Sequence, residues 1–301
     1  VENDLGLTSL KEGTRIQHNG DPKSNLYLFA LSVSEYEDKK YNLKYAVKDG
    51  RDIVNTFLNN ETKFDSIFID TFFNEQVTEN ALDRIAERLK SATINDQVIL
   101  FISGHGLLDK NYDFYFAGHH CNFQNPQEGG IAYAAIESTL SNSVVRKRLL
   151  LMDACHSGEV DKDAIFTRDT SFVLADGAKS GVTSYSYRGV GVEDTEGELG
   201  LNNSFELMKE LFSDFNSQGT QVISAAAGNS YALESEEWAN GVFTYSLLKG
   251  LREKEADLSD GGEISVSELR EYVSKKVFEL TNGQQKPTSR EENIEFDFTV
   301  W

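Results

Sequence analysis

Runs of apolar residues alternate with amphipathic segments along the first half of the chain. Three strand-length runs are apolar nearly throughout, as expected of strands buried on both faces of a parallel sheet: 26–33, 98–102 and 149–152. Residues 66–73 predict a further strand. The segments between these strands predict helices: one that follows Asp49 and has Ile53, Val54, Phe57 and Leu58 on one face, one over 78–92 and one over 130–140. This order predicts an α/β fold with a central, mostly parallel sheet and helices on both faces.

The second half of the chain has a weaker pattern. Residues 159–203 are rich in Gly, Ser, Asp and Thr and predict a long loop. Regular patterns then resume and predict the remaining elements: helices over 205–215, 242–253 and 266–280, and strands over 221–227 and 294–300. The alternating segment 112–117 predicts a hairpin beside the main sheet. No segment approaches the roughly 18 continuous apolar residues of a membrane-spanning helix.

Reactive side chains follow two of the buried runs. Ser103-Gly104-His105-Gly106 comes directly after 98–102, and Asp153 and Cys155 come directly after 149–152. Because parallel strands end at the same edge of a sheet, we expect the imidazole and the thiol to lie on one rim. An imidazolium stabilises a thiolate and can protonate a leaving amine. A single cysteine or histidine in such a place is commonly structural, whereas the pair indicates nucleophilic catalysis.

The segments SGHG (103–106) and DACHSG (153–158) resemble the histidine and cysteine motifs of caspase-like cysteine peptidases, and most closely those of metacaspases and their bacterial relatives. Fifty residues separate His105 from Cys155, the spacing found in caspases. The resemblance implies a caspase-like three-layer sandwich with a six-stranded sheet, and peptide-bond hydrolysis by a dyad of Cys155 (nucleophile) and His105 (general acid–base). The backbone N–H groups of Gly106 and Cys155 would form the oxyanion hole.

The resemblance also implies a preference for basic residues before the scissile bond, at the P1 position. Caspases carry Gln two residues before the cysteine, whereas this chain has Asp153. By motif position, Asp49 (in YAVKDG) and Ser103 would line the same pocket. Two carboxylates and a hydroxyl would bind Arg by bidentate hydrogen bonds, or Lys as a point charge. As an alternative, Asp49 is a carboxylate that stabilises a helix N-terminus.

The resemblance implies a division of the chain into segments. Residues 1–24 lack strong periodicity, which by itself predicts a lead-in or linker from an upstream module, and the resemblance makes 25–301 the peptidase domain. Within that domain lie a large segment (25–158), the activation or processing loop (159–203) and a small segment (204–301). Caspase relatives are often cleaved in this loop, and its candidate self-processing sites are the basic residues Lys162, Arg168, Lys179 and Arg188.

Net charge and cysteine content limit the classes of binding partner and the cellular compartment. A net charge of −20 disfavours nucleic acids and anionic membranes, which need basic surfaces. It also favours a cationic peptide by long-range steering, but solubility is the simpler explanation of the charge. The two cysteines do not form a disulfide framework, and a working thiol needs a reducing compartment, so we expect a cytoplasmic protein. The family resemblance favours a monomer.

The predicted chemistry needs no cofactor, but many metacaspases require calcium. Asp257–Glu268 partly matches an EF-hand loop, with Ser and Gly at two ligand positions, and a turn that caps a helix is the alternative. Asp161 and Asp163 lie near the position of an acidic metal ligand in the family. The cluster formed by His119, His120 and Cys121 lacks a fourth zinc ligand at suitable spacing, and we expect its residues to lie on the surface.

Two other functions compete with the peptidase hypothesis. A phosphate- or nucleotide-binding α/β protein is disfavoured because no Gly-rich phosphate loop follows the first strand. A non-catalytic caspase-like module for binding or regulation is left open by the sequence. For the peptidase, the expected partners are protein or peptide substrates with a basic P1 residue, together with an upstream regulatory domain or an activating partner.

Overall fold

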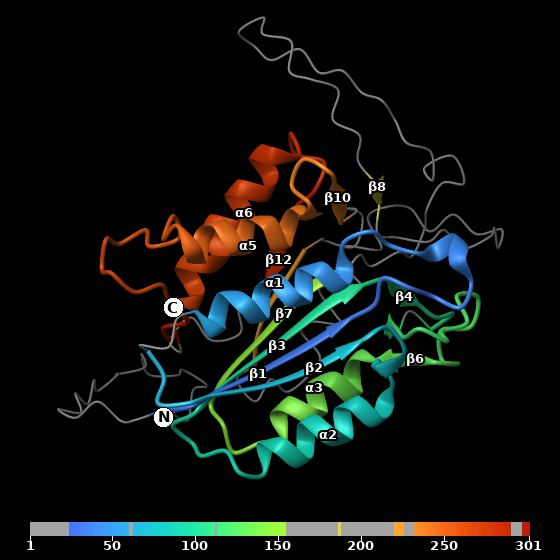
Figure 1. The fold of residues 1–301 in the computed structure, drawn as a ribbon, viewed down its shortest axis with the longest axis horizontal. Helices are drawn as coiled ribbons and strands as arrows, with labels where there is room; N and C mark the ends of the chain where they lie inside the picture. Colours follow the sequence, from blue (N-terminus) through green and yellow to red (C-terminus); the bar gives the residue numbers. More distant parts are fainter. Residues whose placement is uncertain are drawn as a thin grey trace, which may run out of the picture.

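A six-stranded sheet forms the centre of the molecule (Figure 1). The computed structural model describes residues 24–59, 63–111, 113–154, 186–187, 220–225, 232–289 and 297–301. The strand order is β12-β9-β7-β3-β1-β2, with bounds Thr288–Ser289, Thr220–Ser224, Lys147–Ala154, Gln97–Gly104, Leu26–Ser32 and Ile67–Phe73. All neighbouring strands are parallel except β12, which pairs antiparallel with β9. The predicted α/β fold with a mostly parallel sheet is confirmed.

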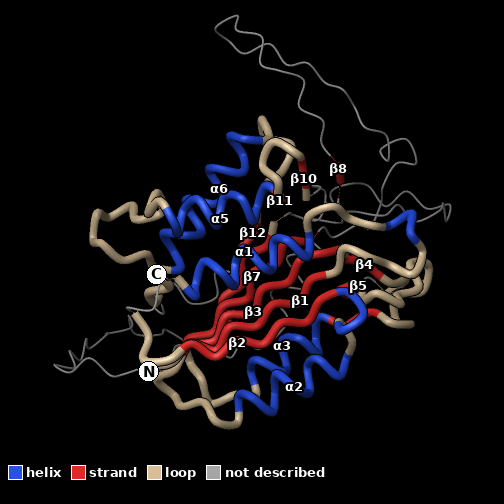
Figure 2. The backbone as a smooth tube through the Cα atoms, in the orientation of Figure 1, coloured by secondary structure: helices blue, strands red, loops and turns tan. Residues whose placement is uncertain are grey.

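Helices cover both faces of this sheet (Figure 2). On one face lie α1 (Ala46–Leu58), α5 (Val242–Arg252) and α6 (Val266–Leu280). On the other lie α2 (Glu79–Leu89) and α3 (Tyr133–Ser141). Alternate residues of β1 enter the two cores, Leu28 on the α1 side and Phe29 on the α2 side. Because both faces are covered, the strand needs apolar residues at every position.

Two details of the predicted helices are wrong. Leu58 does not share the buried face of α1, since its side chain is 43% exposed while Ile53 and Phe57 are buried. The helix predicted over 130–140 begins later, because Gly130–Ala132 forms strand β6. With β4 (Gly106–Leu108) and β5 (Phe114–Ala117), this strand makes a small antiparallel sheet in place of the expected hairpin alone. Short apolar segments do not distinguish a strand from the first turn of a helix.

The chain end differs from the prediction as well. The sixth strand of the sheet is β12, whereas residues 297–301 pair with the segment that enters α6. There the Ile264 N–H donates to the Trp301 carbonyl at 2.7 Å, and the Val300 N–H donates to the Ile264 carbonyl at 2.7 Å. The alternation of apolar residues in this segment indicated which side chains are buried, and Phe298 and Val300 are indeed buried. It carries no information on the pairing partner.

Several predicted segments lie outside the described residues, namely 1–23, the helix over 205–215 and nearly all of the 159–203 loop. The described part of that loop is β8 (Ser186–Tyr187). It pairs with β10 (Leu233–Ser235), which also pairs with β11 (Asn240–Gly241). Among the helices that the structure describes, none is long and apolar enough to cross a membrane. The proposed segment boundaries stay a prediction.

Candidate functional site

Polar side chains line the carboxyl-terminal edge of the sheet. Ser32 of β1, Ser103 of β3 and Asp153 of β7 are in register on adjacent strands, and all three are fully buried. Gly104 pairs with Ala154, so the described ends of β3 and β7 lie side by side, and one residue follows each of them in the sequence. For β3 this residue is His105. For β7 it is Cys155, which lies outside the described residues.

The His105 side chain is held by backbone and aromatic groups. Its Nε2 atom lies 2.8 Å from the Tyr41 carbonyl oxygen, and its backbone N–H donates to the Tyr36 hydroxyl at 3.0 Å. The rings of Tyr36, Tyr41 and Phe123 surround the imidazole at centroid distances of 5.1, 6.4 and 5.5 Å. A carbonyl oxygen only accepts hydrogen bonds, so Nε2 carries the proton of the neutral ring. In that tautomer the Nδ1 atom carries the lone pair of the ring.

Gly104 makes this arrangement sterically feasible. A Cβ atom at this position would lie 3.0 Å from the Tyr36 hydroxyl and 3.0 Å from the Phe116 ring. The absence of a side chain lets the tyrosine reach the His105 N–H. Gly106, the predicted oxyanion-hole residue, follows directly and pairs with Phe116 at the start of β4.

The structure brings Asp49 and Ser103 into contact. Asp49 lies in the first turn of α1 and is fully buried. The Ser103 hydroxyl donates to Asp49 Oδ2 at 3.3 Å. Two further donors come from β11: the Asn240 amide at 2.8 Å and the Gly241 N–H at 3.2 Å, both to Oδ1. Sequence reasoning missed these donors, because they are 191 and 192 positions away from Asp49.

Asp153 accepts hydrogen bonds from the first turn of helix α5, which begins directly after Gly241. Its Oδ2 atom accepts the Thr244 hydroxyl at 2.5 Å and the Thr244 backbone N–H at 3.3 Å. Helix α5 begins after Gly241, which supplies no capping side chain. Asp153 therefore provides the carboxylate that commonly caps a helix N-terminus, and the helix dipole stabilises its negative charge. The sequence offers no capping side chain at Gly241. This gap was the signal that a carboxylate from elsewhere in the chain caps the helix.

Glu234 connects strand β10 to the N-terminus of α1. It is 2% exposed, and its carboxylate accepts the backbone N–H groups of Lys44 at 2.9 Å and Tyr45 at 3.4 Å. Tyr45, the residue that precedes α1, makes no side-chain cap of its own. Glu234 thus caps α1 from a segment 190 residues later in the chain.

Of the four candidate calcium ligands, Asp257 and Glu268 lie within the described residues. Asp161 and Asp163 lie outside the described residues, as do the processing candidates Lys162, Arg168, Lys179 and Arg188. The Asp257 carboxylate accepts the N–H groups of Gly261 at 2.8 Å and Gly262 at 2.7 Å. The Glu268 carboxylate accepts those of Ser259 and Ser265, both at 2.9 Å, and forms a capping box with Ser265. This loop does not supply the ligand set of an EF-hand, and in the described ranges no group of three or more His, Cys, Asp or Glu could hold a metal ion.

The predicted surface cluster at 119–121 is only partly exposed. The side chain of His120 is 61% exposed, but that of His119 is 15% exposed and Cys121 is 8% exposed. The surface prediction is therefore wrong for Cys121, which packs in the core on the α2 side of the sheet. A free cysteine behaves as a small apolar residue, so two adjacent histidines were a misleading guide to its surroundings.

We expect alkylating agents to spare Cys121. Burial raises the pKa of its thiol to about 12, so the protonated, unreactive form dominates at neutral pH. Iodoacetamide at pH 7.5 should modify the folded protein once, at Cys155, and the urea-unfolded protein twice. Peptide mapping by mass spectrometry measures the sites. Labelling of Cys121 in the folded protein would contradict the expectation.

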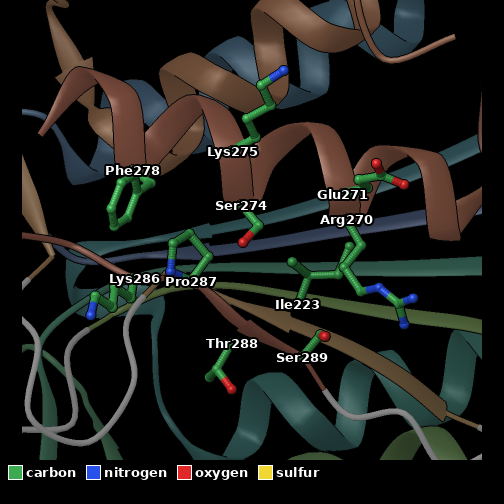
Figure 3. Close-up of a pocket in the computed structure, with 10 residues that line it drawn as sticks. All are labelled: Ile223, Arg270, Glu271, Ser274, Lys275, Phe278, Lys286, Pro287, Thr288 and Ser289. Carbon is green, nitrogen blue, oxygen red and sulfur yellow. The ribbon is translucent and has the colours of Figure 1, made fainter. Parts of the chain in front are cut away.

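A cavity lies elsewhere in the described part of the chain (Figure 3). Its volume is about 680 Å³, and it lies between α6 and the segment that ends in β12. Its lining residues are Ile223, Arg270, Glu271, Ser274, Lys275, Phe278, Lys286, Pro287, Thr288 and Ser289. None of the residues at the ends of β3 and β7 lines it. We therefore place the candidate active site at the sheet edge and not in this cavity.

Comparison with known proteins agrees with this architecture. A family model described as the caspase domain matches residues 29–299. No curated protein matches the chain. The crystal structure of protein GSU0716 from Geobacter sulfurreducens is similar, with a TM-score of 0.54 and 18% sequence identity, over 93% of this chain and 95% of that one. At this identity the likeness shows a shared fold alone.

Proposed function

The chain belongs to the caspase domain family, and from that premise we propose that it is a cysteine endopeptidase that cleaves after Arg or Lys. The supporting observation is the hydrogen bond between His105 Nε2 and the Tyr41 carbonyl at the end of β3. It directs the protonated nitrogen into the protein and reserves Nδ1 for the nucleophile. In this proposal Cys155, the residue after the adjacent strand end, is that nucleophile.

The reaction follows from these groups. His105 Nδ1 accepts the Cys155 thiol proton, and the thiolate attacks the substrate carbonyl carbon to form a C–S bond. The N–H groups of Gly106 and Cys155 stabilise the resulting oxyanion. Collapse of this intermediate breaks the C–N bond, and the imidazolium donates its proton to the leaving amine. His105 then takes a proton from a water molecule, whose oxygen attacks the acyl carbon to form a C–O bond. The C–S bond breaks, the peptide leaves with a new carboxyl group, and the imidazolium returns its proton to the Cys155 sulfur.

The basic P1 preference rests on Asp49, Ser103 and Asp153. A pocket with two carboxylates attracts a guanidinium or ammonium group and repels an aspartate. Both carboxylates are fully buried, so a P1 side chain reaches them only after the covering groups move. The same burial favours a second candidate function, a non-catalytic caspase-like module in which both acids serve only to stabilise α5.

Location and processing are part of the proposal. A working thiol nucleophile needs a reducing environment, which a cytoplasmic location would provide. Self-cleavage in the 159–203 loop, after Lys162, Arg168, Lys179 or Arg188, follows from the same P1 preference. Calcium is proposed as an activator only, because the reaction steps themselves need no metal.

A panel of fluorogenic peptides that differ only at P1 tests the proposed function. We expect Arg and Lys peptides to be cleaved with a kcat/KM about 100-fold above that of citrulline or Asp peptides. A citrulline or Asp side chain at P1 cannot make the buried, charge-assisted contact with the pocket carboxylates. Each assay is run with calcium and with a chelator, and Cys155→Ala protein serves as the blank. Cleavage after Asp would refute the proposed pocket. No cleavage under either condition would favour the non-catalytic module.

A further inference from the structure

Both candidate P1 carboxylates accept hydrogen bonds from residues at the N-terminus of helix α5. Asp153 accepts two hydrogen bonds from Thr244, and Asp49 accepts one each from Asn240 and Gly241. These three donor residues immediately precede or form the first turn of α5. The two acids come from α1 and β7, so only the folded chain brings them to the same helix end.

We propose that Thr244 and Asn240 are positioning residues of the P1 pocket, which hold Asp153 and Asp49 as ionised carboxylates and so set the affinity for a cationic P1 side chain. The inference rests on the proposed peptidase function and deepens it. Neither residue belongs to the histidine and cysteine motifs of the sequence.

The electrostatics support this role. A buried carboxylate without donors tends to take up a proton, because desolvation disfavours its charge. Hydrogen bonds to the carboxylate oxygens and a helix N-terminus favour the ionised form. The helix end carries only about half a positive charge, which leaves most of two negative charges uncompensated. The pocket would therefore stay anionic and would attract a cationic side chain once the covering groups move.

The donors are themselves held in place. The Asn240 amide also donates to Asp52 Oδ2 at 2.9 Å, so it bridges two carboxylates of α1. The Lys48 ammonium lies 2.6 Å from Asp52, so its charge is directed to that carboxylate. Asn240 thus has one defined orientation, with its amide nitrogen toward Asp49.

The arrangement joins the two proposed segments of the peptidase. Asp49 and Asp153 precede the 159–203 loop in the sequence, and Asn240 and Thr244 follow it. The pocket is therefore complete only when the small segment is packed on the large one. Four buried hydrogen bonds across this junction connect substrate affinity to the docking of α5.

Substitution Thr244→Val tests the inference, since valine keeps the shape and the backbone N–H but removes the hydroxyl. We expect KM for an Arg peptide to rise about tenfold, as for the loss of one hydrogen bond to a charged group, with kcat changed less than twofold. The kcat/KM for the citrulline peptide should stay the same, because that P1 side chain has no charge. Thr244→Ser should restore the wild-type KM. Asn240→Ala should act like Thr244→Val through Asp49.

Ser246→Ala is the matched control. Ser246 is also fully buried on α5, but its hydroxyl donates to the Val242 carbonyl at 2.8 Å and not to either acid. Its kinetics should equal the wild type. An unchanged KM in Thr244→Val, or equal losses with Arg and citrulline peptides, would overturn the inference and leave the peptidase assignment intact. A wild-type protein that cleaves neither Arg nor Lys peptides would overturn both.

Discussion

Replacing Cys155 by alanine is expected to lower kcat/KM on Arg and Lys peptides by at least about 10⁴-fold, because loss of a covalent nucleophile leaves only binding and oxyanion stabilisation. The alanine variant forms no C–S bond, so no acyl-enzyme accumulates. Initial rates with purified protein at saturating and limiting peptide concentrations measure the effect. A variant that keeps a tenth of the wild-type activity would disprove the nucleophile assignment.

The same variant decides whether loop cleavage is autocatalytic. Intact-mass analysis of the wild type should show cuts after one or more of Lys162, Arg168, Lys179 and Arg188, and Cys155→Ala protein should stay whole. Cuts that persist in the variant would come from another protease. Cys121→Ala is the control for loss of a thiol. Because Cys121 is buried, we expect that variant to keep both activity and processing.

Replacing His105 by alanine should lower kcat/KM by about 10³-fold, within the range of general acid–base catalysis. The loss has two causes: the thiol is no longer activated, and the leaving amine receives no proton. His105 is 3% exposed and packs among aromatic rings, so thermal unfolding must show that the variant is folded. His105→Asn fills more of the space and should be equally inactive.

His120→Ala is the control for removal of an imidazole. The His120 side chain is 61% exposed and pairs with Glu37 at 3.0 Å, and surface ion pairs contribute little. We expect its kinetics and stability to match the wild type. If His105→Ala kept more than a tenth of the activity while folded, another group would have to serve as the base, and the dyad would be wrong.

The predicted strands and helices succeeded where burial imposes a simple pattern. Strand β1 was found because both of its faces are covered, which makes it apolar throughout. Helix α6 was predicted with the bounds that the structure has, Val266–Leu280. The pairing of 297–301 with Ile264 was missed, because alternation shows which side chains are buried and not which backbone they pair with.

The sequence by itself determined the candidate chemistry: His105 after one buried strand, Cys155 after the next, and Asp49, Ser103 and Asp153 by motif position. His105 and Cys155 were proposed from local order, because each follows directly after an apolar run, whereas Asp49, Ser103 and Asp153 were proposed from the family resemblance. Only the tertiary structure revealed the partners, namely Tyr41 for His105, Asn240 for Asp49 and Thr244 for Asp153. These contacts span 64, 191 and 91 positions, and such hydrogen bonds depend on how α1, α5 and the sheet pack, which no local pattern encodes.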